Sequence, residues 1–177
     1  MKCSIVMSTY DHAPLLRRTL ASIYKQHPPF EWECIVVDDG DPDPTTAEVC
    51  REFPVRYVRI DREPGFRNPA HARNVGYKLA CGGVIIAQSD DVMHASETTI
   101  QDLVAKLSPG TFVIATVRNV DANMQPSHTP FHEFTGLNNQ RPFFFLGAVY
   151  RRDLYAVGGN DEDFIAPGYD DDWFAAV

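Results

Sequence analysis

The stretch VIIAQSDDVMH, residues 84–94, contains the transition that indicates the fold of this chain. The run VIIAQ is typical of a strand buried on both faces, as in a parallel sheet, and it stops at two adjacent aspartates, Asp90 and Asp91. No lysine or arginine stands beside these two carboxylates. One explanation is that they bind a cation. The other is that Ser89 and Asp90 begin a turn, because such side chains hydrogen-bond the backbone there.

The same alternation of a short apolar run and an amphipathic segment occurs along the chain. Strands are predicted over 3–9, 33–39, 55–60, 84–88, 111–117 and 143–150, and helices over 13–26, 45–53, 69–83, 96–107 and 152–156. Alternating elements of this kind imply an α/β fold with a mostly parallel sheet and helices on both faces. There is no internal repeat or linker, so we expect a single domain over residues 1–177.

Two helix ends carry local signals. Thr45 and Glu48 have the spacing of a capping box at the start of the helix predicted over 45–53. The glycines of the ACGG sequence, residues 80–83, are expected to close the helix predicted over 69–83.

Pairs of aspartates follow two of the predicted strands. Asp38 and Asp39 come after one strand, and Asp90 and Asp91 after another. In open parallel sheets ligands bind at the carboxyl ends of the strands, where the strand order reverses. We therefore expect the four carboxylates to line one crevice, which favours the cation explanation. No G-x-G-x-x-G follows the first strand, so a nicotinamide dinucleotide site is not supported.

The composition excludes several classes of protein. The 44% hydrophobic and 23% charged content is typical of soluble globular proteins, and no apolar run approaches the ~20 residues of a membrane-spanning helix. The N-terminus carries no export signal, which favours a cytoplasmic location. The net charge of −8 disfavours a nucleic-acid partner. The four cysteines are widely spaced, so buried free thiols are expected rather than a zinc site or disulfides.

Four segments together resemble glycosyltransferase family 2, whose members have a GT-A fold. They are SIVMSTYDHAPLLRRTLASIYKQ, ECIVVDDGDPDPT, RNPAHARNVGYKLACGGVIIAQSDD and GAVYRRDLYAVGGNDEDFIAPGYDDDWF, in the family's order and spacing. The resemblance implies an inverting, metal-dependent transferase that moves a sugar from a nucleotide diphosphate donor to an acceptor hydroxyl. Uridine diphosphate sugars are the family's commonest donors. It also implies a nucleotide-sugar-binding half, residues 1–117, and an acceptor and catalytic half, residues 118–177.

The donor residues follow from this resemblance. Ser8, Thr9 and Tyr10 correspond to residues that line the nucleoside pocket, and Asp39, beside Asp38, is similar to the residue that hydrogen-bonds the base. A carboxylate can accept a hydrogen bond from a ring N–H. The alternative for the two aspartates is a polar turn before Gly40.

The SDD sequence occupies the place of the family's Asp-X-Asp motif. By resemblance Asp91 is a ligand of a divalent cation, Mn²⁺ or Mg²⁺, and Asp90 faces the ribose or the metal. A hard cation suits carboxylate and phosphate oxygens and stabilises the leaving diphosphate. Arg67 and Arg73 stand where the family often has a basic residue near the diphosphate; the alternative is a solvated helix face.

The GYDDDWF sequence near the end of the chain resembles the family's acidic motif, in which one carboxylate is the general base. We prefer Asp170 as the base, while other registers give Asp171 or Asp172. Trp173 would then lie near the acceptor sugar. The alternative is that the three carboxylates cap a helix.

The chain stops at Val177, a few residues beyond this motif, where relatives usually continue. We therefore expect either a fragment of a longer protein or a short member of the family. A non-catalytic module of the same fold that binds a nucleotide sugar or a carbohydrate is an alternative function. A sugar-phosphate nucleotidylyltransferase is a weaker one, since the early glycine-rich signature of those enzymes is missing.

Overall fold

The computed structural model describes residues 2–63, 68–125, 133–134 (backbone only) and 144–164. Its main sheet has six strands in the order β3-β2-β1-β4-β8-β5. They are β1 (Cys3–Thr9), β2 (Trp32–Asp38), β3 (Arg56–Arg59), β4 (Val84–Gln88), β5 (Phe112–Ile114) and β8 (Leu146–Tyr150). Strands β1 to β4 pair in parallel, and β8 is antiparallel to both β4 and β5. The predicted α/β fold with a mostly parallel sheet is confirmed.

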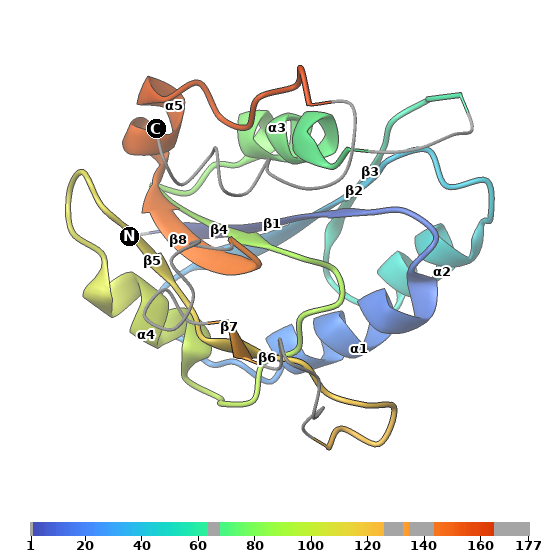
Figure 1. Cartoon of the computed structure of the whole chain (residues 1–177), viewed down its shortest axis with the longest axis horizontal. Helices are drawn as coiled ribbons and strands as arrows, with labels where there is room; N and C mark the ends of the chain where they lie inside the picture. The colour runs from blue at the N-terminus through green and yellow to red at the C-terminus, as the bar shows by residue number, and fades with distance from the viewer. Residues whose placement is uncertain (1, 64–67, 126–132, 135–143, 165–177) are drawn as a thin grey trace.

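The helices cover both faces of this sheet. They are α1 (Ala13–Ile23), α2 (Thr45–Arg51), α3 (Ala70–Leu79), α4 (Thr99–Lys106) and α5 (Arg151–Ala156). Figure 1 shows α3 and α5 on one face and α1, α2 and α4 on the other. Side chains alternate along each strand, so Ile5 and Met7 of β1 pack in the core under α1 and α4, whereas Val6 packs in the core under α3.

Two predicted helix ends are wrong. No capping box forms at α2: its N-cap is Pro44, and Thr45 instead donates to the carboxylate of Asp43, two residues earlier. Helix α3 ends at Leu79, and Ala80 is already extended. The glycine after it serves packing, because a Cβ on Gly82 would lie 2.6 Å from the backbone nitrogen of Ser4.

The remaining strands and the cysteines complete the described structure. A second, two-stranded sheet pairs β6 (Val117–Arg118) with β7 (Glu133–Phe134). All four cysteines are free thiols, as predicted, and three of them are buried. Burial raises the pKa of Cys3 and of Cys50 to about 12, so these thiols are not reactive at neutral pH. Within the described residues no helix combines the length and apolar character needed to cross a membrane.

Candidate functional site

The carboxyl end of β1 lies where the strand order reverses. The chain proceeds from β1 to β2 on one side, whereas β4 lies on the other side of β1. β1 pairs with β4 only as far as Val6, so Ser8 and Thr9 extend past the last paired residue of β4. Thr9 is buried, and its hydroxyl has no hydrogen-bond partner among the described residues. Ser8 and Tyr10 are half-buried.

Asp38 ends β2, and its fully buried carboxylate already accepts hydrogen bonds from other parts of the protein. Its Oδ1 accepts from the backbone N–H of Asp41 at 2.7 Å, and its Oδ2 accepts from the Tyr57 hydroxyl at 2.6 Å. Arg59 donates to the same Oδ2 at 3.4 Å. These contacts tie the end of β2 to the following loop and to β3.

Asp39 has a different environment, although it is the next residue. It lies past the end of β2, where its backbone N–H donates to the Thr9 carbonyl at 3.0 Å. Its buried carboxylate accepts from Arg62 at 3.0 and 3.1 Å. Gly40 then has φ +82°, which favours glycine, and a Cβ there would lie 3.2 Å from the carbonyl oxygen of Ile60. Asp39 therefore belongs to the turn before Gly40 and at the same time lies beside Thr9 at the end of β1.

A third carboxylate, Asp41, joins the loops that follow β1 and β2. Its Oδ2 accepts from the backbone N–H of Asp11 at 3.0 Å and from the Thr46 hydroxyl at 2.7 Å. Asp11 itself has φ +55°, an uncommon conformation for a residue other than glycine. The two loops are therefore fixed to one another at the same end of the sheet.

Asp90 lies at the end of β4 with most of its side chain buried. Its Oδ1 is 3.3 Å from Nδ1 of His12, in the loop between β1 and α1. That contact, chiefly through its hydrogen bond, raises the pKa of His12. Gln88, the last residue of β4, stabilises the turn that contains Asp90, because its Nε2 donates to the Val92 carbonyl at 2.8 Å. A basic partner thus exists for Asp90, although none stands beside it in the sequence.

Asp91 is exposed at the rim of this turn. Desolvation by the surrounding protein raises its pKa, and the negative charge of Asp90 raises it further. The positive charges of His12 and Arg73 act in the opposite direction. A carboxylate that lies beside a second negative charge is stabilised by a cation, so this turn is a site where a cation can bind.

Arg73, on α3, is buried rather than on a solvated face of the helix. Its charge influences the pKa of Asp91, so the guanidinium belongs to the same electrostatic environment as the carboxylates. The structure thus brings Arg73 to the edge where the sequence predicted an anionic group to bind.

The described residues contain no group of three or more histidine, cysteine, aspartate or glutamate side chains that could hold a metal ion. The donor set at this edge is the pair Asp90 and Asp91. One or two carboxylates completed by substrate phosphates are the usual protein ligands of Mg²⁺, so the pair fits a cation that arrives with a diphosphate.

Several predicted site residues lie outside the described residues. They are Arg67, Asp170, Asp171, Asp172 and Trp173. The donor-side residues can therefore be placed in the fold, whereas the acidic GYDDDWF motif remains a prediction from the sequence.

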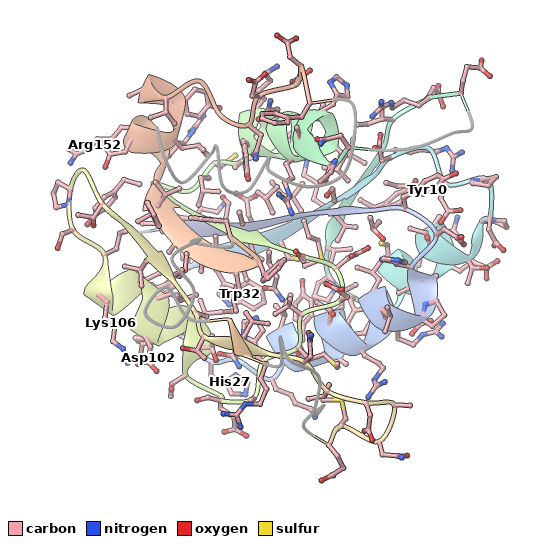
Figure 2. The ribbon with its side chains drawn as sticks, viewed as in Figure 1. Tyr10, His27, Trp32, Asp102, Lys106 and Arg152 are labelled. Atoms are coloured by element: carbon pink, nitrogen blue, oxygen red, sulfur yellow. The ribbon has the colours of Figure 1, made fainter. Side chains whose placement is uncertain are left out.

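A hollow of about 640 Å³ lies at another part of the molecule. It is lined by Gly83, Pro109, Tyr150, Arg151, Arg152 and Tyr155. Gly83 precedes β4 and Tyr150 pairs with Val84, so this hollow is at the amino end of the parallel strands. Figure 2 shows Tyr10 and Arg152 on opposite sides of the view. The hollow is separate from the carboxylate edge, which is the edge of the sheet where Asp39, Asp90 and Asp91 follow the strands.

The comparison with known families agrees with this geometry. The model of "Glycosyl transferase family 2" matches residues 4–161. The chain belongs to glycosyltransferase family 2. The matched range contains the first three of the four segments that resembled the family and part of the fourth.

Curated relatives of this family 2 chain are similar over part of its length. The dolichol-phosphate mannosyltransferase of Pyrococcus furiosus is 28% identical over 114 residues, which are 63% of this chain and 31% of the relative. The validoxylamine A glucosyltransferase of Streptomyces hygroscopicus subsp. jinggangensis is 36% identical over 107 residues, or 58% and 24%. The match thus spans about a third or less of these relatives.

Solved structures share the fold. The mannosyltransferase PcManGT of Pyrobaculum calidifontis, in complex with GDP-Man and Mn²⁺, superposes with a TM-score of 0.69 at 23% identity, covering 97% of this chain and 50% of that one. S. aureus TarS in complex with UDP gives a TM-score of 0.73 at 19% identity, covering 99% and 54%. The family 2 chain therefore has the GT-A fold and spans about half of these structures.

Sequence reasoning missed the partners of the predicted carboxylates. His12 contacts Asp90, Arg62 contacts Asp39, and Tyr57 contacts Asp38. Two arginines of β3 and the loop after it, Arg59 and Arg62, thus pair with the protein's own aspartates. The strand register between β2 and β3, which places Asp38 opposite Arg59, was the signal that a sequence alone does not provide.

Proposed function

We propose that this family 2 chain transfers a sugar, with inversion, from a nucleotide diphosphate donor to an acceptor hydroxyl, using a divalent cation. A uridine diphosphate sugar is the proposed donor class. The observation that carries the proposal is that the carboxyl ends of β1, β2 and β4 meet at one edge. Asp39, after β2, is hydrogen-bonded to Thr9 of β1. Asp90, after β4, contacts His12 of the β1–α1 loop. Family membership supports the reaction class.

Each residue at this edge has a proposed part. Asp39 accepts a hydrogen bond from the ring N–H of the base, and Ser8, Thr9 and Tyr10 line the nucleoside pocket. Asp38, predicted beside them, instead supports this end of β2 through its hydrogen bonds to the Asp41 amide and the Tyr57 hydroxyl. Asp91 and Asp90 hold Mn²⁺ or Mg²⁺, which supplies positive charge to the diphosphate oxygens. Arg67 and Arg73 add guanidinium donors for the same phosphates. The complex of PcManGT with GDP-Man and Mn²⁺ is consistent with this combination of ligands in a protein of the same fold.

The chemical step is a single in-line displacement. A carboxylate of the GYDDDWF motif, Asp170 in the preferred register, removes the proton from the acceptor hydroxyl. The acceptor oxygen forms a bond to the anomeric carbon while the bond from that carbon to the diphosphate breaks. The electron pair leaves with the nucleotide diphosphate, and the carboxylate keeps the proton. Trp173 is proposed to contact the acceptor sugar.

The test is an assay of sugar release from a panel of nucleotide sugars, with and without candidate acceptors, in Mn²⁺ or in chelator. We expect turnover with a uridine diphosphate sugar in Mn²⁺ and its loss in chelator. Asp170→Asn should lower the turnover about 10²- to 10⁴-fold, because a general base acts only as the acceptor loses its proton. The affinity for the donor should remain nearly unchanged.

The matched controls are Asp171→Asn and Asp172→Asn, which should have milder effects. If one of them is the sensitive position, the reaction stands and the register of the base is wrong. A chain that binds a nucleotide sugar but transfers and hydrolyses none would contradict the proposal. A longer version extended past Val177 then separates the outcomes: turnover would identify a fragment of an enzyme, and silence would identify a binding module.

A further inference from the structure

The turn that carries Asp90 and Asp91 is closed by backbone hydrogen bonds. The backbone N–H of Ser89 donates to the Phe145 carbonyl at 2.8 Å, and the backbone N–H of Val92 donates back to the Ser89 carbonyl at 3.3 Å. Asp90 and Asp91 are therefore the two central residues of a turn from Ser89 to Val92, which we call the site turn. The Asp91 carboxylate is hydrogen-bonded to its own backbone N–H, so its direction follows the backbone of the site turn.

One buried side chain, that of Gln88, closes the other side of the site turn. Its Nε2 donates to the Val92 carbonyl at 2.8 Å, and its Oε1 lies 3.0 Å from Nε2 of His94. Because a carbonyl can only accept, the contact with Val92 fixes which way round the Gln88 amide lies. His94 then donates from Nε2, as a neutral imidazole does in one of its two tautomers. Burial lowers the pKa of His94 to about 4, which agrees with a neutral ring at neutral pH.

His94 is itself anchored to α1. Its backbone N–H donates to the Ser22 hydroxyl at 3.0 Å, and that hydroxyl donates to the Thr19 carbonyl at 2.7 Å. Figure 1 shows the segment between β4 and α4 passing alongside α1. Gln88 therefore connects the site turn, through His94, to a helix whose apolar face lies in the core.

A second buried glutamine stabilises the same connection farther from the two aspartates. Gln26, just after α1, donates from Nε2 to the Ser96 carbonyl at 2.6 Å and accepts from the backbone N–H of Ile100 at 3.3 Å. Gln88 and Gln26 are 1% and 3% exposed, and both ends of each amide are hydrogen-bonded. They differ in what they hold, because Gln88 closes the site turn whereas Gln26 holds the start of α4. The two glutamines are thus a matched pair for an experiment.

We propose that Gln88 is a positioning residue for the cation site, because it fixes the backbone from which Asp90 and Asp91 extend. This inference rests on the proposed function, in which these two carboxylates hold the cation that accompanies the diphosphate. Outer partners that orient the ligands of a metal typically contribute about 10- to 100-fold to its affinity. The residues proposed to bind the nucleoside lie at the ends of β1 and β2, so nucleoside binding should not depend on Gln88.

The experiment measures, by titration calorimetry, the Kd of uridine diphosphate in Mn²⁺ and in chelator, and the Kd of uridine, which has no diphosphate. The ratio of the two constants for uridine diphosphate is the enhancement by Mn²⁺. Gln88→Met keeps the size of the side chain and removes both hydrogen bonds. The enhancement should therefore fall about tenfold or more, while the Kd for uridine stays within about twofold of wild type. Gln26→Met removes the same kinds of contact and should lower the melting temperature comparably, but it should retain the enhancement.

A second variant keeps the test decisive if Gln88→Met does not fold. His94→Phe keeps a ring but removes the donor to the Gln88 amide, so the enhancement should fall in the same direction by a smaller factor. The inference is overturned by an unchanged enhancement in the variant that folds, by an equal loss in Gln26→Met, or by a uridine affinity that falls as much as the affinity for uridine diphosphate in Mn²⁺. A wild type that binds uridine diphosphate no more tightly in Mn²⁺ than in chelator overturns the proposed cation site and the inference together. A wild type with the enhancement, beside unaffected variants, overturns the inference alone.

Discussion

Two neighbouring carboxylates, Asp38 and Asp39, perform different tasks because of what lies next to each. Asp38 is fully buried and accepts from a backbone amide, a tyrosine hydroxyl and a guanidinium. Asp39 is nearly as buried, but its carboxylate accepts from Arg62, whose side chain is about one third exposed. A ligand can therefore compete for or share Asp39, whereas Asp38 is committed to holding β2 and β3 together.

This difference gives a prediction for two alanine variants. Asp38→Ala leaves the Tyr57 hydroxyl and the Asp41 amide without an acceptor, so the free energy of unfolding should fall by about 3 kcal/mol. Asp39→Ala should cost less stability, since Arg62 can reach water, and should abolish the rise in melting temperature that uridine diphosphate and Mn²⁺ produce. Urea unfolding and thermal melts measure the two effects. An intact ligand-induced shift in Asp39→Ala would mean that the nucleoside pocket is misplaced.

Among the elements, α3 is the one whose packing most constrains the site. Gly76 lets the helix lie close to β1, since a Cβ there would be 2.3 Å from Cγ1 of Val6. Helix propensity alone would favour alanine over glycine by about 1 kcal/mol. The steric cost of a methyl group in a filled core is larger, about 1–3 kcal/mol, so the contact decides the residue.

The corresponding prediction uses a pair of substitutions. Gly76→Ala should lower the free energy of unfolding, and Val6→Ala should lower it by removing buried methyl groups. The double variant should be more stable than the sum of the two losses predicts, because Val6→Ala makes room for the new methyl group. Urea unfolding of the four proteins measures this coupling. Strict additivity would show that α3 adjusts its position instead of pressing on Val6.

The sequence predicted these elements well where hydrophobic periodicity was strong and poorly where side chains from distant segments decide. The strands up to β4 and the helices α1 to α4 lie within the predicted ranges or one residue outside them, because burial on each face imposes the spacing. The predicted cap at Thr45 is wrong because the helix begins one residue earlier than the pattern requires: Pro44 is the N-cap, and the Glu48 N–H donates to its carbonyl. The carboxyl-end location of Asp39 and Asp90 was predictable from topology, but their partners Arg62 and His12 depend on loop conformations that no local pattern encodes.

The stability of the whole molecule toward acid depends on groups that titrate differently when folded. His94 follows the turn after β4 that contains Asp90 and Asp91. Its Nε2 lies 3.0 Å from Oε1 of Gln88, and its buried Nδ1 has no partner in the described structure. Burial lowers its pKa from 6.5 to about 4. His12 shifts in the opposite direction through its contact with Asp90, but its side chain is 49% exposed, so its effect on stability is small.

We therefore predict that the free energy of unfolding falls as the pH is lowered from 6.5 to about 4, through His94. In the unfolded chain His94 binds a proton near pH 6.5, whereas in the folded protein it stays neutral down to about pH 4. The resulting contribution to the free energy of unfolding is complete above pH 6.5, and up to about 3 kcal/mol is lost by pH 4. His94→Gln should flatten the profile in this window, while the exposed His27→Gln should leave it unchanged. Urea unfolding at a series of pH values measures both. A wild-type slope in His94→Gln would assign the acid sensitivity to other groups.

The reversed direction of β8 has a consequence for how such a molecule can diversify. Because β8 is antiparallel to β4, its first residue, Leu146, pairs with Gln88 beside the carboxylate edge, and the carbonyl of Phe145 accepts from Ser89. The chain between β5 and β8 therefore re-enters the sheet next to Asp90. Changes at the start of β8 would therefore alter the surroundings of Asp90, and of the donor proposed to bind there, while leaving the register of the parallel strands β1 to β4 as it is.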